Sequence, residues 1–205
     1  CCYDPQMRRN PPLIEKVYDW FIQVCKISKE LKQIFDNKMK NYDLDKVIRK
    51  VPDFPKPGIL FSDISPLLKS HFTETIDAMS ALFTEAEWTE IDCVAGIESR
   101  GFIFAAALAY KHNKGFIKVR KPGKLPNVAA SIEYGLEYGS DKLEMQKGDG
   151  SKIVLLDDLI ATGGSMGAAA SLCEQVGYDV VGMACLIDLA SLNSFTYNDK
   201  TVRSV

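Results

Sequence analysis

Short apolar runs alternate with helix-like stretches along the second half of the chain. The apolar runs predict strands at Cys93–Ile97, Gly115–Arg120, Ile153–Leu156 and Val180–Leu186. The stretches between them predict helices at Gly101–His112 and Ser165–Val176, the second of which is closed by Gly177. Alternating strands and helices favour an α/β fold, in which helices flank a twisted parallel sheet and the crossovers are right-handed.

The first third of the chain has a different pattern. Leu13–Phe35 has apolar residues at helical spacing, so residues 1–38 predict an N-terminal helical extension. Asp43–Lys50 predicts a further short helix, which Pro52 stops. Val51–Leu68 combines prolines with apolar residues and predicts an extended segment packed over other parts of the protein.

One long polar segment interrupts the alternation. Lys121–Gly150 is punctuated by glycines and is too long for a plain connection, so it predicts a mobile functional loop or a hairpin. The chain therefore divides into an extension, residues 1–38, and a main domain, residues 39–205. The main domain carries the extended segment at about 51–68 and the long loop at about 121–150.

Composition narrows the class of protein. The 205 residues carry a formal net charge of −2, with 46% hydrophobic and 25% charged residues, which is typical of a globular domain. This balance argues against a bulk nucleic-acid binder or a membrane-surface protein. The apolar runs are all well short of the roughly 20 residues of a membrane span.

Cysteine and histidine usage adds two expectations. The six cysteines contain no C-x-x-C pair and predict reduced residues of a cytoplasmic protein: Cys1, Cys2, Cys25, Cys93, Cys173 and Cys185. His71 and His112 are too scattered for a metal site, so we expect any metal to arrive with the ligand.

The segment VLLDDLIATGGS, residues 154–165, is the most informative motif. Its apolar strand places Asp157 and Asp158 at the carboxyl end, where α/β sheets bind ligands. Thr162–Ser165 follows as a glycine-rich turn, and Ser165 is a suitable N-cap for the next helix. Glycines let backbone amides approach an anion, and the helix dipole favours negative charge there. The motif predicts a phosphate cradle beside two carboxylates, and it lacks the Gly-Lys-Ser/Thr of a Walker loop.

A phosphorylated ribose explains both parts of this motif. The carboxylates would accept hydrogen bonds from the two ribose hydroxyls and offset positive charge developing on the ring. The arrangement resembles the phosphoribosyl-pyrophosphate (PRPP) signature of type I phosphoribosyltransferases. The alternative is a strand that ends in solvated aspartates before an ordinary capped helix.

Two further segments place cations at the same sheet edge. Glu98-Ser99-Arg100 follows a predicted strand and is a candidate pyrophosphate site: Glu98 and Ser99 would present backbone amides, and the arginine fork pairs well with a pyrophosphate. Lys121 and Lys124 follow the next strand within VRKPGKLP, where they would hold a leaving pyrophosphate. The competing interpretations are a solvated arginine at a helix start and a solvated charge cluster.

Five segments together resemble the adenine phosphoribosyltransferases over roughly residues 45–190: VPDFPKPGILFSDISPLL, GIESRGFIFAAALA, RKPGKLP, LEYGSDKLEMQK and VLLDDLIATGGS. The resemblance implies conversion of adenine and PRPP to AMP and pyrophosphate, dependent on Mg²⁺, by a cytoplasmic homodimer in purine salvage. It implies that the extended segment is a hood over the site. It also implies that Mg²⁺ is held through PRPP near Asp157 and Asp158, and that the 5′-phosphate binds to Ala161, Thr162, Gly163, Gly164 and Ser165.

The resemblance also assigns the base-binding residues. Phe61 would stack on adenine while the backbone of Leu60 and Ser62 reads its edge. The EYG triplet occurs twice, and spacing to Leu143–Gln146 matches the family only from the second copy. Glu137 then becomes the candidate for moving a proton on adenine, and Tyr138 part of a closing loop that excludes water.

The chain departs from the family pattern at three places. Ser62 stands where the family often has Arg or Lys, Pro122 follows Lys121, and the extension through about residue 38 has no counterpart in compact members. Three alternatives stay open: a non-catalytic PRPP or nucleotide sensor, an enzyme of the same fold acting on another base, and a degenerate paralogue.

Overall fold

The computed structural model describes residues 44–136 and 139–205. The predicted N-terminal extension, Asp43, Glu137 and Tyr138 lie outside the described residues. The chain forms two compact units, one ending at Ile64 and the other covering Ser65–Val205. We describe each unit by itself.

The first unit contains a small antiparallel hairpin. After a short 3-10 helix, η2 (Leu44–Val47), the strands β1 (Arg49–Pro52) and β2 (Leu60–Asp63) pair with Val51 opposite Phe61. The predicted short helix over Asp43–Lys50 is confirmed only as the 3-10 helix Leu44–Val47, because Arg49 and Lys50 pair with a second strand. The extended segment over Val51–Leu68 is confirmed for its first part, and a helix begins at Ser65.

The second unit is an α/β structure. Its helices are α2 (Ser65–Ser70), α3 (Phe72–Ser80), α4 (Glu85–Glu90), α5 (Gly101–Lys111) and α6 (Gly164–Val176). Its strands are β3 (Cys93–Ile97), β4 (Gly115–Val119), β5 (Ala130–Leu136), β6 (Gly139–Met145), β7 (Lys152–Ile160), β8 (Asp179–Asp188), β9 (Thr196–Tyr197) and β10 (Lys200–Ser204).

The main sheet confirms the predicted fold class. Six strands lie in the order β4-β3-β7-β8-β10-β9, and every neighbouring pair is parallel except β10 and the two-residue β9. The strands predicted from apolar runs are its four consecutive members β4, β3, β7 and β8. The sheet is therefore mostly parallel, with one short antiparallel edge strand.

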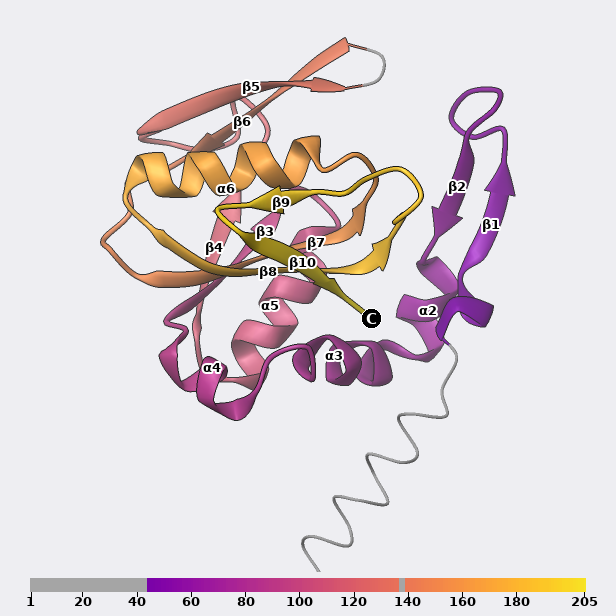
Figure 1. Cartoon of the computed structure of the whole chain (residues 1–205), viewed down its shortest axis with the longest axis horizontal. Helices are drawn as coiled ribbons and strands as arrows, with labels where there is room; N and C mark the ends of the chain where they lie inside the picture. The colour runs from indigo at the N-terminus through magenta and orange to yellow at the C-terminus, as the bar shows by residue number, and fades with distance from the viewer. Residues whose placement is uncertain (1–43, 137–138) are drawn as a thin grey trace, which may run out of the picture. The chain divides into compact units, whose positions relative to one another are not determined.

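Helices cover both faces of this sheet (Figure 1). Helix α6 packs on one face against β7 and β8, while α5 packs on the other against β3, β4 and β7. Val154, Leu155 and Leu156 are consecutive in β7 and all fully buried, although alternate residues of a strand point to opposite faces. The apolar run thus reflects a strand covered on both sides, as the sequence predicts.

The segment Lys121–Gly150 forms a hairpin. Its strands β5 and β6 pair antiparallel with Tyr134 opposite Asp141. The hairpin lies over α6, on the side of the helix away from the sheet (Figure 1). Leu143 and Met145 are buried in the same apolar core as Met166 of α6. Of the two sequence expectations, loop or hairpin, the hairpin is confirmed.

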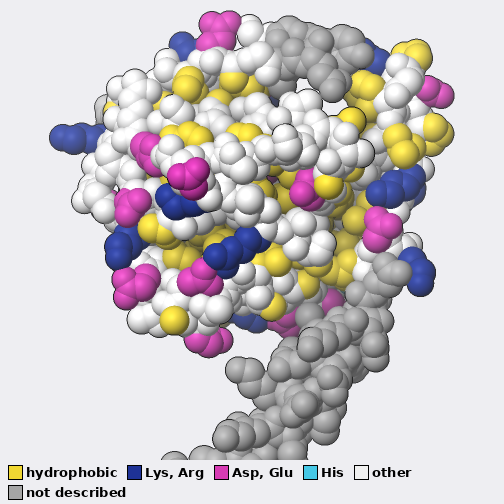
Figure 2. Space-filling model, viewed as in Figure 1, with side chains coloured by type: hydrophobic (Ala, Val, Ile, Leu, Met, Phe, Trp, Pro, Cys, Tyr) yellow, Lys and Arg dark blue, Asp and Glu magenta, His cyan; other side chains and the backbone are white. Residues whose placement is uncertain are grey.

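The remaining surface and cysteine features agree with a folded globular unit. On the face in Figure 2, basic and acidic side chains are interspersed.

Cys93, Cys173 and Cys185 are free thiols, and burial raises the pKa of Cys173 and Cys185 to about 12. Within residues 44–136 and 139–205, no helix has the length and apolar character needed to cross a bilayer.

Candidate active site

The carboxyl ends of the central strands border a cavity of about 470 Å³. Its lining contains predicted site residues from three separate segments and one residue, Leu159, that sequence reasoning missed. The lining residues are Glu98, Ser99, Arg100, Lys121, Lys124, Asp157, Asp158, Leu159 and Ser165. The fold therefore brings the predicted cations, the acid pair and the start of α6 to one place.

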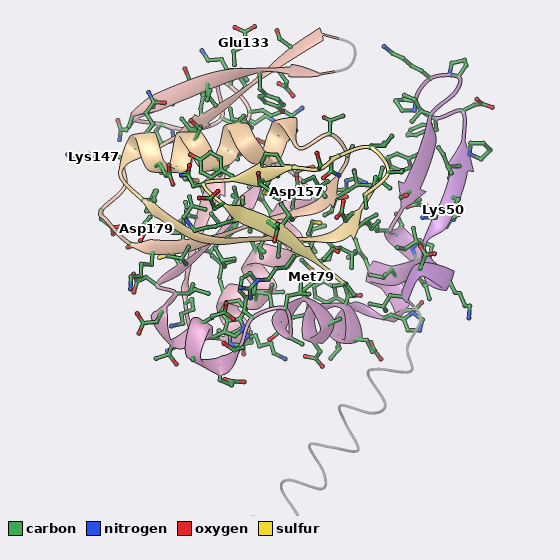
Figure 3. All side chains as sticks on the ribbon, viewed as in Figure 1. Lys50, Met79, Glu133, Lys147, Asp157 and Asp179 are labelled. Atoms are coloured by element: carbon green, nitrogen blue, oxygen red, sulfur yellow. The ribbon has the colours of Figure 1, made fainter. Side chains whose placement is uncertain are left out.

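The acid pair lies within β7 rather than after it. β7 pairs with β3 only as far as Leu156, but it continues to pair with β8 as far as Ile160. The expectation that the strand ends before Asp157 was wrong for this reason. Figure 3 labels Asp157, and it labels Asp179 at the opposite, amino edge of the sheet.

Burial and one ion pair set the electrostatics of the two carboxylates. Asp158 is 5% exposed, and its Oδ2 lies 3.0 Å from Arg100 Nε. Burial raises the pKa of Asp158, and the Arg100 guanidinium opposes that rise. Burial and the neighbouring Asp158 charge raise the pKa of Asp157 well above its ordinary value. Burial disfavours the ionised form of both carboxylates. A positively charged ligand group beside them would stabilise that form.

A glycine allows the Arg100 turn to approach this pair. A Cβ on Gly101 would lie 2.7 Å from the Leu156 carbonyl oxygen and 3.1 Å from Asp157 Oδ1. The absence of a side chain thus lets the start of α5 sit directly against β7. The Glu98–Ser99 peptide in the same turn is cis.

Glu98 organises the basic side of the cavity. Its carboxylate pairs with Arg120 Nε at 3.2 Å, with Lys124 Nζ, and with the Lys121 backbone N–H at 2.8 Å. Burial opposes its ionised form, but the hydrogen bonds from Lys124, Lys121 and Arg120 outweigh that effect and hold the pKa at about 2. An anionic Glu98 repels phosphate, so we assign it as the counter-ion that holds the cations in place.

The glycine-rich turn begins α6 earlier than the sequence predicts. Gly163, with φ of 86°, is the N-cap, and the helix starts at Gly164. The prediction of Ser165 as N-cap was therefore wrong, because the left-handed conformation of Gly163 turns the chain into the helix without a hydroxyl cap. Ser165 instead lies in the first turn, where helical amides have no carbonyl partner within the helix.

Phe195 supports this turn from behind, and sequence reasoning missed it. A Cβ on Gly163 would lie 2.5 Å from Phe195 Cδ2, and one on Gly167 would lie 3.0 Å from Cε2. Asn193 holds the Phe195 segment, since its side chain accepts from the Phe195 N–H at 3.2 Å and donates to Asp188 at 3.1 Å. The two glycines facing one aromatic ring are recognisable only once the chain is folded.

Other predicted residues lie elsewhere. Thr162 lines a second cavity together with Ser191–Phe195. Ala161, Gly163 and Gly164 belong to the turn but are not among the lining residues of the first cavity. Leu60, Phe61 and Ser62 form β2 of the first unit, where the Phe61 ring contacts Phe54 edge-on at 5.1 Å between centroids. Glu137 and Tyr138 lie outside the described residues.

Comparison with known proteins identifies the class. The chain matches the phosphoribosyl transferase domain family over residues 69–204, a range that contains every residue lining the cavity. The α/β fold is thus that of a phosphoribosyltransferase domain, and the cavity lies within it.

Individual relatives give a more specific identification. The adenine phosphoribosyltransferase of Hydrogenovibrio crunogenus is 70% identical over 167 residues, which is 82% of this chain and 97% of that protein. The one of Bdellovibrio bacteriovorus is 48% identical over 164 residues, 80% of this chain and 98% of that protein. The crystal structure of the Saccharomyces cerevisiae enzyme, complexed with D-2,5-dideoxy-2,5-imino-altritol 1,6-bisphosphate and adenine, matches with a TM-score of 0.70 and 37% identity. It covers 79% of this chain and 96% of that one. This chain belongs to the adenine phosphoribosyltransferase family.

Proposed function

We propose that this protein transfers the 5-phosphoribosyl group of PRPP to adenine, giving AMP and pyrophosphate in purine salvage. One observation carries the proposal: a single cavity is lined by Arg100, Lys121 and Lys124, by Asp157 and Asp158, and by Ser165 at the start of α6. PRPP carries phosphate groups on both sides of its ribose. Two anion-binding ends separated by an acid pair match that order of charges.

The residues divide the work along the substrate. Arg100, Lys121 and Lys124 hold the pyrophosphate as its bond to ribose C1 breaks. The turn Ala161–Ser165 holds the 5′-phosphate through backbone amides, and this remote binding positions C1 for attack. Asp157 and Asp158 bind the ribose hydroxyls and stabilise the positive charge that develops on the ring.

The base is held by a separate group of residues. Phe61 stacks on adenine, and the backbone of Leu60 and Ser62 reads its edge. Adenine N9 attacks C1 from the face opposite the departing pyrophosphate. Glu137 assists the proton of the base, and Tyr138 belongs to the loop that excludes water from the reacting ribose.

The acid pair also fits Mg²⁺. This ion is usually bound by one or two carboxylates together with substrate phosphates, and Asp157 is a partly exposed carboxylate at the cavity. The pyrophosphate and ribose hydroxyls of PRPP would hold the ion, close to Asp157 and Asp158. When bound with PRPP, Mg²⁺ neutralises charge on the leaving pyrophosphate.

The family resemblance further supports a homodimer in the cytoplasm. Ile103 and Tyr110, seven residues apart on one face of α5, are exposed, as is Phe116 on the edge strand β4. Tyr110 is 91% exposed, which is a high fraction for a large aromatic ring. A second copy packed on this surface would cover the apolar side chains. Sedimentation velocity on the wild type and Tyr110→Glu tests this, since a dimer that dissociates on substitution is expected.

The activity is tested by AMP formation from adenine and PRPP with Mg²⁺, with hypoxanthine, guanine and orotate in parallel. Turnover with adenine alone is expected, and Asp158→Asn should abolish most of it. Turnover with another base would overturn the choice of adenine. Saturable PRPP or AMP binding without turnover would favour a sensor or a disabled paralogue.

A further inference from the structure

The first copy of the duplicated EYG triplet has no role in the proposed reaction, and the structure gives it one. Tyr134 of this copy is half-buried on β5, directly opposite Asp141 on β6. Its ring lies against the start of α6, 3.9 Å from the position of a Cβ on Gly164. The hairpin thus contacts the phosphate-binding turn through this tyrosine.

A row of polar side chains runs through Tyr134. Burial raises the pKa of Tyr134, and the neighbouring Ser165 hydroxyl opposes that rise. The Tyr134 hydroxyl donates to Asp141 Oδ2 at 3.4 Å, and Lys121 Nζ lies 2.8 Å from the same oxygen. The other carboxylate oxygen, Asp141 Oδ1, accepts the Lys142 N–H at 2.8 Å. Both oxygens of Asp141 are therefore occupied, and the carboxylate is fixed in orientation.

The two ends of this row line the cavity, and its two middle members do not. Lys121 and Ser165 are lining residues on the basic and the phosphate side. A lysine has a flexible stem with much rotamer freedom, which it loses when it binds an anion. Asp141 fixes Lys121 before any ligand arrives, and the ammonium group retains further donors for a phosphate.

Charge supports the same arrangement. The hydrogen bond and charge of Asp141 raise the pKa of Lys121, which therefore stays cationic. Burial opposes ionisation of Asp141, but Lys121 and the Lys142 amide outweigh it and lower the pKa of the carboxyl. The pair is ionised at neutral pH, so its attraction holds under the conditions of turnover.

We propose that Asp141 and Tyr134 are positioning residues that preset Lys121 for the pyrophosphate and the first turn of α6 for the 5′-phosphate of PRPP. This inference rests on the proposed function. The competing explanation is a cross-strand pair that only stabilises the hairpin. The two explanations predict different effects on substrate binding. Loss of a purely structural pair has no reason to weaken binding at one end of PRPP more than at the other.

The reverse reaction separates the two ends of PRPP, because pyrophosphate and AMP bind as independent substrates. Asp141→Asn keeps the shape of the side chain and removes the charge that holds Lys121. We expect it to raise KM for pyrophosphate about fivefold, the size of one lost ordinary hydrogen bond, and to change KM for AMP less than about twofold. Tyr134→Phe keeps the ring contact with Gly164 and removes the hydroxyl, so KM for AMP should rise about threefold.

Matched controls lie at the other edge of the sheet. Asp149→Asn makes the same chemical change at a carboxylate that accepts from Ser151 instead. Tyr178→Phe removes the hydroxyl of another partly buried tyrosine. We expect all KM values of both controls to equal those of the wild type. Calorimetric titration of inorganic pyrophosphate with Mg²⁺ into each protein gives a readout that needs no turnover, and Asp141→Asn should weaken binding to the same extent.

The outcomes distinguish the inference from the function on which it rests. An active wild type whose Asp141→Asn and Tyr134→Phe variants melt at lower temperature with unchanged KM values would overturn the inference alone. Equal KM increases for adenine, PRPP, AMP and pyrophosphate would overturn it as well. A wild type that neither turns over nor binds PRPP would overturn the proposed function, and the inference with it.

Discussion

Arg100 and Asp158 form an ion pair across two neighbouring strands, with Arg100 Nε 3.0 Å from Asp158 Oδ2. Arg100 follows β3 and Asp158 lies in β7, which is paired with β3. The aspartate side chain is 6% exposed and the arginine side chain 38%, so the buried charge is compensated by a group that also faces the cavity. The pair links the basic end of the cavity to the carboxylates at its centre.

Loss of Arg100 is expected to move the acid limb of the pH–rate profile. Burial raises the pKa of Asp158 and Arg100 opposes that rise, so Arg100→Gln raises this pKa further. Because the proposed mechanism uses the ionised acid pair, the decline in kcat/KM on acidification should then begin at higher pH. Rates measured from pH 5 to 9 check this. An acid limb at the wild-type position would contradict the assigned role of the pair.

Asp157→Asn should raise the thermal stability of the protein while it lowers the enzymatic activity. The pKa of Asp157 is raised in the folded state, so the stability this group contributes is present below its unfolded pKa and is lost as the pH rises through its folded pKa. At pH 7 the neutral amide therefore favours the folded state, and Tm should rise by about 2–4 °C for each kcal/mol gained. Turnover should fall by at least about 100-fold, since charge stabilisation at the ribose is lost.

Thermal melts and initial rates on the same Asp157→Asn preparation give both values. Leu159→Ala, at another lining residue of the cavity, serves as a control that leaves the charge unchanged. A variant that is less stable than the wild type at pH 7 and equally active would contradict both expectations.

Glu98→Gln is expected to reduce stability in a pH-dependent way. The pKa of Glu98 is lowered from 4.5 to about 2, so its contribution is present above pH 4.5 and lost as the pH falls towards 2. Because its partners Lys124 and Arg120 are partly exposed, we expect a loss of only about 1 kcal/mol at pH 7. Urea unfolding at pH 7 and pH 3 should show the difference between variant and wild type shrinking at the lower pH.

Gly163→Ala should disturb the proposed phosphate-binding turn more than the strain of a left-handed backbone alone would. The new Cβ would meet Phe195 at 2.5 Å, and φ is 86°. Gly150→Ala is the matched control, since its φ is 87° and nothing lies within 4 Å of the added Cβ. We expect KM for PRPP to rise at least about tenfold in the first variant, as for a misplaced binding group, and to stay unchanged in the second. Equal increases in KM for PRPP in the two variants would show that the contact with Phe195 does not contribute to the effect.

Phe61→Leu tests the base-binding residues separately from the PRPP site. Stacking of a base on an aromatic ring contributes about 1–3 kcal/mol, so KM for adenine should rise about tenfold or more. KM for PRPP should stay within about twofold, because the cavity residues lie in the other unit. Phe61→Tyr retains the ring and should behave like the wild type. A rise in KM for PRPP alone would argue against stacking on the base.

Several boundaries could not be derived from sequence. The start of α6 at Gly164 depends on the left-handed conformation of Gly163, which the hydroxyl-rich turn does not reveal. β7 continues through the acid pair because β8 still pairs with it after β3 has ended. Arg49 and Lys50 belong to a strand rather than a helix because Asp63 and Ser62 pair with them. In each case a neighbour distant in sequence outweighs the local preference.

The sequence by itself determined the strand–helix alternation, the positions of the buried strands and the types of residue at the carboxyl edge of the sheet. These follow from local pattern, because a strand covered on both faces has to be apolar and an anion site needs glycines and cations. Only the tertiary structure decided which charges pair, as Arg100 with Asp158 and Lys121 with Asp141, and that Phe195 supports Gly163. Those contacts depend on strand order and helix packing, which place residues far apart in the chain within a few ångströms of each other.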